Sequence, residues 1–295
     1  MPQPLIVAIT LNWNRPDDTL VCVESLLAQT YGHLAVVVVD NGSTDDSVAQ
    51  VQARFPQVAV IANETNLGFA GGMNVGLRWA LAAGADFALI VNNDTLLATD
   101  MVARLGEVAQ AERAVTAPII YYADEPQRVW SLGARMNDWT LEEVGNVRGQ
   151  VDVGQWAALV PCNFVPGCAM FFPREVLETV GLFDEGFFMY YEDSDLCLRL
   201  TRGGWPILSV TGAKMWHKVA VSSGGSDSVN ERYWMARSSV RFFSKHARWW
   251  QGPIVLFWRT GSAVRTTWRL WRHGRMEALK AYWRGLADGL RGLGR

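Results

Sequence analysis

Several features are scarce or absent in this 295-residue sequence, and each absence argues against one kind of site or one class of protein. It has only four His, too few for a His-rich zinc site. Its four Cys form no C-x-x-C pair and follow no secretory signal, which favours reduced thiols in a cytoplasmic protein. No apolar run reaches about 18 residues, so no membrane-spanning helix is expected. Arg15 is the only Lys or Arg in the first 50 positions, which argues against a nucleotidyltransferase with a basic phosphate-gripping loop.

Charge and tryptophan are distributed unevenly along the chain. Residues 241–295 contain 12 Lys and Arg and two acids, a net charge of +10, whereas residues 1–240 contain 15 basic and 27 acidic residues, a net charge of −12. Six of the 14 Trp also lie in the basic part. We therefore predict a boundary near residue 245, with a main domain over 1–245 and a basic, Trp-rich helical tail over 246–295.

Apolar, β-branched runs alternate with segments of helical character in the first 100 residues. Strands are predicted at 5–10, 34–40, 58–62 and 87–92, with helices at about 16–29, 46–55 and 71–83. This alternation predicts an α/β fold with a doubly wound, mostly parallel sheet, followed by a C-terminal helical appendage. Ligands of such sheets bind beyond the carboxyl ends of the strands, where Asp40 and Asn92–Asp94 are placed.

The segment 121–245 is less regular. Strands are predicted at 165–172 and 205–210, and a helix at 194–202 that is closed by two glycines. The Ser- and Gly-rich stretch 222–228 is predicted to be a flexible loop.

Three carboxylates, Glu192, Asp193 and Asp195, are crowded at the start of the helix predicted at 194–202. Carboxylates are costly to desolvate, and like charges this close repel each other. Two interpretations are open at this stage. The residues form either a solvated acidic first turn, which the helix dipole favours, or a reaction site.

Asn92, Asn93 and Asp94 follow the strand predicted at 87–92. Such residues suit Mg²⁺ or Mn²⁺, which take one or two carboxylates together with substrate phosphates. An Asx turn would explain the same tetrapeptide without a metal.

Three further features are ambiguous when each is taken alone. The glycine-rich turn 66–76 could let backbone N–H groups approach phosphate, although it matches neither the dinucleotide fingerprint nor the P-loop. His217 could be a ligand or a structural residue. Tyr233 and Arg237 lie at i and i+4 on one helical face, where Arg237 could bind diphosphate or stack on an aromatic ring in solvent.

Together and in this order, these segments resemble the glycosyltransferase family 2 enzymes of GT-A fold, and within them the rhamnosyltransferase-like group. The resemblance spans roughly residues 4 to 245. The motifs that carry it are Thr10-Leu-Asn-Trp-Asn14, Val39-Asp-Asn-Gly-Ser-Thr-Asp45, Asn66-Leu-Gly-Phe-Ala-Gly-Gly72, Asn92-Asn-Asp94, Pro166-Gly-Cys-Ala-Met170, Gly181-Leu-Phe-Asp-Glu185, Glu192-Asp-Ser-Asp-Leu-Cys197 and His217.

The resemblance implies an inverting transfer from a nucleotide-diphosphate sugar. Residues 1–120 would form a nucleotide-binding part and residues 121–245 an acceptor-binding part. Asp40 would contact the nucleotide base, with Thr10 nearby, and the segment around Asn66 would close over the nucleotide. The residues expected to bind the nucleotide sugar are Thr10, Asn12, Asp40, Asn66, Gly71, Gly72, Asn92, Asn93 and Arg237.

The resemblance also implies the remaining catalytic parts. Asp94 matches the last acid of the D-x-D motif and would hold Mg²⁺ or Mn²⁺, whereas Asn92 replaces the first acid of many members. His217 matches a position that can complete the metal coordination. Asp193 matches the general base, and Glu192 and Asp195 would orient the site, bind acceptor hydroxyls or set the pKa of Asp193.

An inverting displacement needs one base and one Lewis acid, which Asp193 and the metal on Asp94 would supply. Arg237 matches an Arg near the diphosphate, although Ser238 replaces the usual Asn that follows it. The alternative is a non-catalytic nucleotide-sugar- or glycan-binding protein on the same fold. The presence of Asp94, Asp193 and His217 together argues against this alternative.

The expected donor is dTDP-L-rhamnose and the expected acceptor a saccharide or lipid-linked glycan. The basic tail, with Trp interleaved with Arg, suits an anionic membrane surface and thus a cytoplasmic enzyme on the inner face of the membrane. It could instead pack on the catalytic domain or on a second copy in a homodimer. Nucleic-acid binding is not expected, because the larger part is acidic and no nucleic-acid-binding motif accompanies the tail.

Overall fold

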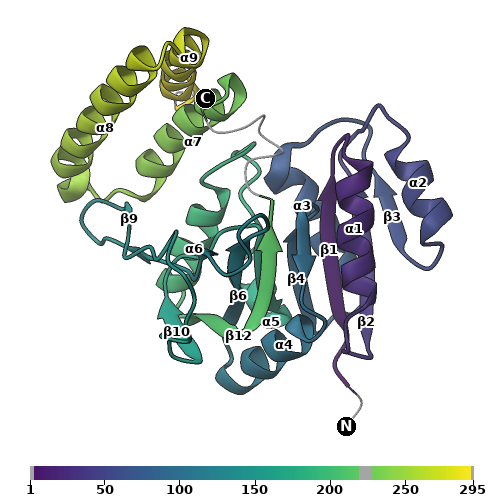
Figure 1. Cartoon of the computed structure of the whole chain (residues 1–295). Helices are drawn as coiled ribbons and strands as arrows, with labels where there is room; N and C mark the ends of the chain where they lie inside the picture. Colours follow the sequence, from purple (N-terminus) through teal and green to yellow (C-terminus); the bar gives the residue numbers. More distant parts are fainter. Residues whose placement is uncertain (1–2, 219–226, 294–295) are drawn as a thin grey trace.

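The structure is a computed structural model that describes residues 3–218 and 227–293. Most of the loop predicted at 222–228 therefore lies outside the described residues. A large α/β part contains the sheet, and a cluster of long helices lies beside it, at the upper left of Figure 1.

The N-terminal half of the sheet is parallel. Its strands lie in the order β4-β1-β2-β3. They are β1 (Ile6–Asn12), β2 (Leu34–Asp40), β3 (Ala59–Ala62) and β4 (Phe87–Asn92). The helices that connect and flank them are α1 (Pro16–Leu27), α2 (Ser47–Arg54), α3 (Gly68–Ala82) and α4 (Met101–Glu112). The four strands and three helices predicted for this half are therefore confirmed.

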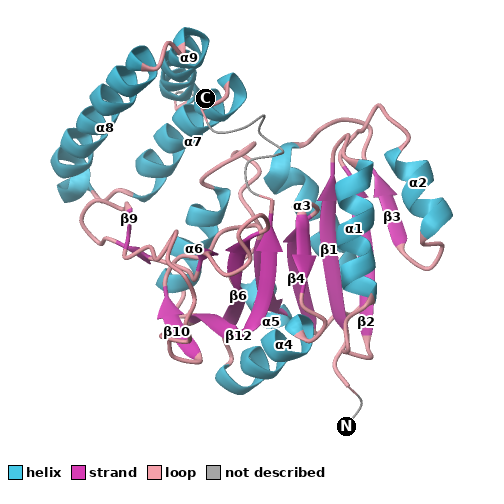
Figure 2. Cartoon of the chain, viewed as in Figure 1, coloured by secondary structure: helices cyan, strands magenta, loops and turns pink. Residues whose placement is uncertain are grey.

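Side-chain alternation divides the interior into two cores. Val7, Ile9, Val37 and Val39 face α3, whereas the residues one position before each of them face α1 and α4. Successive side chains of a strand point to opposite faces, so these unbroken apolar runs are buried on both sides. Figure 2 shows the resulting helix–sheet–helix layers.

The second half extends the same sheet with mixed strand directions. The full order is β10-β12-β6-β11-β4-β1-β2-β3, with β5 on β12 and β7 on β6. These strands are β5 (Thr95–Leu97), β6 (Val115–Tyr122), β7 (Val129–Ser131), β10 (Leu159–Cys162), β11 (Ala169–Pro173) and β12 (Ile207–His217). A separate hairpin is formed by β8 (Arg135–Met136) and β9 (Glu143–Val144). Helices α5 (Arg174–Thr179) and α6 (Glu192–Arg202) complete this half.

Several predicted elements differ in extent from those observed, and the strand predicted at 165–172 begins only at Ala169. The strand predicted at 205–210 continues to His217, because its last residues pair with β5 as well as with β6. The helix predicted at 194–202 begins two residues earlier, at Glu192, so all three crowded acids lie inside its first turn.

The C-terminal unit consists of α7 (Val229–His246), a short 3-10 turn η1 (Trp249–Gln251), α8 (Gly252–Arg272) and α9 (Met276–Gly292). Glycines let α9 lie directly on α7: a Cβ at Gly285 would stand 2.3 Å from the backbone oxygen of Tyr233. The C-terminal helical appendage is thereby confirmed. Helix α7 lies before the predicted boundary at 245 and packs with the tail, and the division of the chain at 245 stays a prediction.

Within the described residues, none of the helices has both the length and the apolar character that crossing a membrane requires.

Candidate active site

Polar side chains meet where β1, β2 and β4 end. Parallel register places Asn12 beside Asp40, and Asn12 Nδ2 donates a hydrogen bond to Asp40 Oδ1 over 2.7 Å. The Thr19 hydroxyl donates to Asn12 Oδ1 and accepts from Asn93 Nδ2. The backbone N–H and hydroxyl of Ser43 both donate to Asp40. The buried carboxylate of Asp40 is thus held at the sheet edge by a continuous hydrogen-bond chain.

The glycine-rich segment before α3 is organised by amides. Asn66 Oδ1 accepts hydrogen bonds from Asn41 Nδ2 and from the backbone N–H of Gly68. Gly68 has a positive φ of 75°, and a Cβ there would meet the backbone oxygen of Phe188 at 2.3 Å. A Cβ at Gly72 would meet Leu11 of β1 at 2.5 Å. These glycines therefore allow close backbone packing, and the nucleotide roles predicted for Asn66, Gly71 and Gly72 stay predictions.

The structure brings Asp94 and His217 together although 123 positions separate them. Pairing of β5 with β12 sets His217 opposite Thr95, and His217 Nε2 lies 3.1 Å from Asp94 Oδ1. Both side chains are buried, and the ring packs edge-on against Trp130. His217 Nδ1 has no hydrogen-bond partner among the described residues, which is costly for a buried polar atom.

These two side chains fit part of a hard-cation site. Mg²⁺ and Mn²⁺ commonly take one or two protein ligands and complete their shell with phosphate oxygens and water. The described residues contain no group of three His, Cys, Asp or Glu side chains that could enclose an ion on its own. Asp94 and His217 therefore suit an ion that is shared with a phosphorylated ligand.

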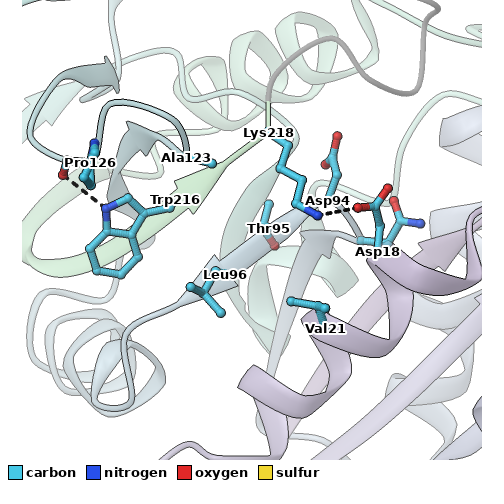
Figure 3. Close-up of a pocket in the computed structure, with 10 residues that line it drawn as sticks. Asp18, Val21, Asp94, Thr95, Leu96, Ala123, Pro126, Trp216 and Lys218 are labelled. Carbon is cyan, nitrogen blue, oxygen red and sulfur yellow. Dashed lines mark hydrogen bonds and ion pairs between the residues drawn. The ribbon is translucent and has the colours of Figure 1, made fainter.

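A pocket of about 310 Å³ opens beside Asp94 (Figure 3). Asn93, Leu96 and Trp216 line it, and Lys218 spans its mouth with Nζ 2.6 Å from Asp18 Oδ1. Burial opposes ionisation of Asp18, but hydrogen bonds from Lys218 and Arg15 lower its pKa overall. Sequence reasoning missed Asp18 and Lys218, since neither the helix start nor the residue after His217 marks them as neighbours.

Asp193 lies at the start of α6, with its carboxylate fixed by main-chain donors. Oδ2 accepts from the backbone N–H of Gly167 over 3.1 Å, and Oδ1 accepts from that of Ser194 over 2.7 Å. Burial raises the pKa of Asp193, and these hydrogen bonds oppose the rise. The absence of a side chain at Gly167 matters here, because a Cβ would lie 3.4 Å from that of Asp193.

The segment Gly167–Cys168 connects Asp193 to the end of β4. While Gly167 donates to Asp193, the carbonyl of Cys168 accepts from the backbone N–H of Asn92. Burial raises the pKa of the Cys168 thiol well above its usual value, and the carboxylates of Asp94 and Asp193 raise it further. Both acids are therefore electrostatic neighbours of one residue, although Asp193 does not line the pocket beside Asp94.

Glu192 and Asp195 have very different environments from each other. Glu192 is buried, and its Oε2 has no hydrogen-bond partner among the described residues. Burial, and then the neighbouring charge of Asp193, raise the pKa of Glu192 well above its usual range. Burial and a neighbouring like charge both disfavour ionisation of this carboxyl group.

Asp195 is fully buried and lies among basic side chains. His246 Nε2, Lys245 Nζ and Arg199 Nε lie within 2.6–2.8 Å of its oxygens. Burial alone would raise the pKa of Asp195, but these partners lower it well below its usual range. His246 Nδ1 faces a guanidinium nitrogen of Arg202, which can only donate, so Nδ1 accepts there and Nε2 donates to Asp195.

A fourth acid, Glu143, stands near Asp193 and was missed in the sequence. It lies at the surface of the β8–β9 hairpin. Even so, desolvation and then the charge of Asp193 raise its pKa to about 7. The irregular segment 121–160 gives no periodic signal that would place an acid over the start of α6.

Two predicted site residues lie elsewhere. Thr10 is buried beneath α1, where its hydroxyl contacts Cys22. Arg237 is an exposed residue of α7 that stacks on Trp234, which stacks in turn on Phe188. The hydroxyl of Ser238 donates to the carbonyl of Met189 and so ties α7 to the loop before α6. The donor-binding roles of Thr10 and Arg237 stay predictions.

Comparison with known proteins identifies the family. The model of the family described as glycosyl transferase family 2 matches residues 7–181, more than half of the chain. The chain belongs to glycosyl transferase family 2. The matched residues include Asp40, Asp94 and Gly167, and the resemblance found in the sequence is confirmed.

Relatives with known activity include rhamnosyltransferases. The glycosyltransferase is 24% identical over 263 residues to an N-acetylglucosaminyl-diphospho-decaprenol L-rhamnosyltransferase of Mycobacterium tuberculosis, covering 82% of this chain and 85% of the relative. It is 24% identical over 268 residues to the dTDP-rhamnosyl transferase RfbF of Shigella flexneri, covering 88% and 86%. The resemblance to the rhamnosyltransferase-like group is thereby confirmed.

Solved structures show the same fold. A mannosyltransferase of Pyrobaculum calidifontis, in complex with GDP-Man and Mn²⁺, matches with a TM-score of 0.59 and 18% identity over 98% of this chain and 76% of its own. GalNAc-T7, with UDP, GalNAc and Mn²⁺, matches with a TM-score of 0.59 and 17% identity over 79% of this chain. This chain spans about half of GalNAc-T7, 47% of its length. The predicted GT-A fold is confirmed.

Proposed function

We propose that this glycosyltransferase transfers a sugar, with inversion, from a nucleotide diphosphate to a glycan acceptor, with Asp193 as general base. The observation that carries the proposal is the fixed carboxylate of Asp193, one peptide segment away from the strand end that bears Asp94. Both Asp193 oxygens are held by N–H donors, so the group is oriented before any substrate arrives.

The proposed step is a single displacement. The acceptor hydroxyl oxygen bonds to the anomeric carbon, the bond from that carbon to the diphosphate oxygen breaks, and the hydroxyl proton passes to Asp193. Its raised pKa makes Asp193 a better base than an ordinary carboxylate. Burial and the charge of Asp193 disfavour ionisation of Glu192, and we assign to it the orientation of the acceptor or of Asp193. We assign to Asp195 the positioning of α6 through its cationic partners.

Asp94 and His217 would hold Mg²⁺ or Mn²⁺ against the diphosphate. When bound, the ion would neutralise charge that develops on the leaving group. The contact between Asp94 and His217, the lack of a partner for His217 Nδ1 and the Mn²⁺ complexes of two structural neighbours support this role. Lys218, which is paired with Asp18 at the pocket mouth, would become a cation for the diphosphate if the donor displaced that pair.

The relatives favour dTDP-L-rhamnose as donor and a diphosphate-linked lipid saccharide as acceptor. Asp40, at the end of β2, would contact the nucleotide base, with Asn12 and Asn93 holding its surroundings. Such an acceptor would place the enzyme at the cytoplasmic face of a membrane.

Transfer should depend on the metal ligands Asp94 and His217, and the binding of dTDP tests this directly. We expect EDTA to abolish transfer and Mn²⁺ or Mg²⁺ to restore it. In isothermal titration, dTDP should bind the wild type more tightly with Mn²⁺ than without, and Asp94→Asn and His217→Ala should remove that difference. Asp100→Asn, which removes an exposed carboxylate that pairs with Arg104, serves as a matched control.

Full transfer in EDTA would contradict the metal role of Asp94 and His217 but would leave Asp193 as base. Binding of dTDP-L-rhamnose without turnover on any acceptor of a broad saccharide panel would instead favour the alternative of a sugar-nucleotide-binding protein.

A further inference from the structure

The outer side of α8 carries an apolar stripe that nothing in the described chain covers. Phe257, Val264, Trp268 and Trp271 follow one another at intervals of seven, four and three, which places them on one face of the helix. Their exposed fractions are 76%, 65%, 54% and 63%. The opposite face holds the buried Val255 and Leu270, so α8 has one packed side and one apolar side in solvent. We call these four residues the α8 stripe.

Helix α9 continues this surface. Met276, Trp283 and Leu290 recur at intervals of seven, and all three are exposed. The indole N–H of Trp283 donates to the hydroxyl of Thr267 over 3.2 Å, which places Trp283 next to the α8 stripe. The apolar surface therefore extends from α8 onto α9. A contiguous exposed patch of this kind usually marks an interaction surface.

Positive charge borders the stripe. Arg265 and Arg272 are exposed and seven residues apart, and the Arg272 guanidinium lies 5.1 Å from the ring centroid of Trp268. Among the described residues, no carboxylate forms an ion pair with Arg265 or Arg272. The tail from residue 246 contains only two acids. An apolar stripe edged by cations is complementary to an anionic lipid surface.

We infer that the α8 stripe and its arginines dock this enzyme on an anionic lipid bilayer, with the aromatic rings in the interface and the guanidinium groups on lipid phosphates. Tryptophan is favoured at that depth because its ring is apolar while its N–H needs a polar partner. This inference deepens the proposed function, because it states where a lipid-linked acceptor would meet the enzyme. The docking itself does not depend on the sugar that is transferred.

The docking surface is attached to the α/β part through the β8–β9 hairpin. Gln251, just before α8, donates to the carbonyl of Asp138 in the β8–β9 hairpin over 2.6 Å. Arg259 of α8 forms an ion pair with Glu142, the residue before Glu143. The hairpin that carries Glu143 towards Asp193 is thus attached to the base of α8, as Figure 1 shows for β9 and α8. Docking of α8 would fix the height of the acceptor site above the bilayer.

Co-sedimentation of the full-length protein with vesicles tests the inference without any assay of transfer. The wild type should sediment with phosphatidylcholine vesicles that contain phosphatidylglycerol, much less with phosphatidylcholine alone, and less as salt increases. Arg265→Gln/Arg272→Gln should lower the partition coefficient about thirtyfold, and Trp268→Ser/Trp271→Ser at least about tenfold. The matched controls are Arg54→Gln/Arg113→Gln and Val153→Ser, exposed positions of the α/β part that should sediment like the wild type.

Equal binding to both kinds of vesicle, or undiminished binding of the two α8 variants, would overturn the inference. A wild type that does not bind vesicles would also overturn it if the protein forms a dimer that Trp268→Ser/Trp271→Ser dissociates, because the stripe would then be a protein interface.

Melting temperatures check that the variants fold. If the Trp variant unfolds, the Arg variant decides, because its two side chains are exposed and outside the core. Loss of vesicle binding with unchanged transfer to a soluble acceptor separates docking from the proposed chemistry.

Discussion

The sheet edge and the C-terminal helices differ in which side chains they bury and which they expose. At the sheet edge, polar side chains such as Asp40 and Asn12 are buried and hydrogen-bonded. On α8, aromatic side chains such as Trp268 and Trp271 are exposed. Both arrangements cost free energy in an isolated protein, the first through desolvation and the second through apolar surface left in water. The comparison supports the two proposals, which assign a small polar ligand to the sheet edge and an extended one to the helices.

The largest expected effect is a loss of turnover that leaves the binding of the C-terminal helices to vesicles unchanged. Asp193→Asn should lower turnover by about 10²–10⁴, because the acceptor proton loses its base, while donor binding and vesicle binding stay at wild-type levels. Turnover with saturating donor, together with calorimetric donor binding, measures this. Near-normal turnover would mean that Glu192 or another group takes the proton.

Asp195, two residues along the same helix, should affect stability, because its ion pairs connect α6 with α7. Asp195→Asn leaves its cationic partners on α6 and α7 uncompensated and should cost about 3 kcal/mol of unfolding free energy, since Arg199 and Lys245 keep some solvent. Denaturant unfolding measures this cost. A variant as stable as the wild type but catalytically dead would give Asp195 a direct role in the reaction.

The pH dependence adds a second readout for Asp195. Its folded-state pKa is depressed, so its stabilisation is present above the unfolded carboxylate pKa of about 3.9 and is lost as the pH falls further. The wild type should therefore lose more stability than Asp195→Asn between neutral and strongly acidic pH. Parallel curves would contradict the assigned ion pairs.

A glycine variant should disturb the helices alone. Gly285→Ala places a Cβ against the Tyr233 carbonyl and should cost about 1–3 kcal/mol in the α7–α9 unit, through overpacking. Gly261→Ala, which meets nothing within 4 Å on α8, should be neutral or stabilising. Hydrogen exchange should show loss of protection in α7 and α9 and none in β1 or β2. Equal loss in the sheet would mean that the two parts unfold as one unit.

The smallest effect concerns the hairpin between the regions. The raised folded-state pKa of Glu143, about 7, reflects desolvation and the charge of Asp193, so Glu143→Gln removes a negative neighbour of the base. Asp193 is already ionised where Glu143 titrates, so the acidic limb of the pH profile of kcat/KM should stay in place, and a titration near pH 7 should disappear from the profile. Glu125→Gln, an exposed acid of the same part, is the control. A titration near pH 7 that persists in Glu143→Gln would remove Glu143 from the surroundings of the base.

The local features of this protein follow from its sequence alone. Runs such as Leu34–Asp40 are apolar and β-branched, and they form strands wherever a sheet can bury them, so four strands and the helices between them were predictable. The charge division near residue 245 is likewise a property of the sequence. The motifs around Asp40, Asp94 and Asp193 carried the family resemblance, because their order survives without any knowledge of contacts.

The contacts between distant side chains, in contrast, follow from how the elements pack. His217 reaches Asp94 because β12 extends past its predicted end and pairs with β5. Asp193 and Asp195 look equivalent in sequence, yet helix geometry turns one to Gly167 and the other to His246, with opposite effects on their pKa values. Amphipathicity predicted helices in the tail, but which face stays in solvent depends on how α7, α8 and α9 pack. Such outcomes arise from contacts between distant segments, which no local pattern encodes.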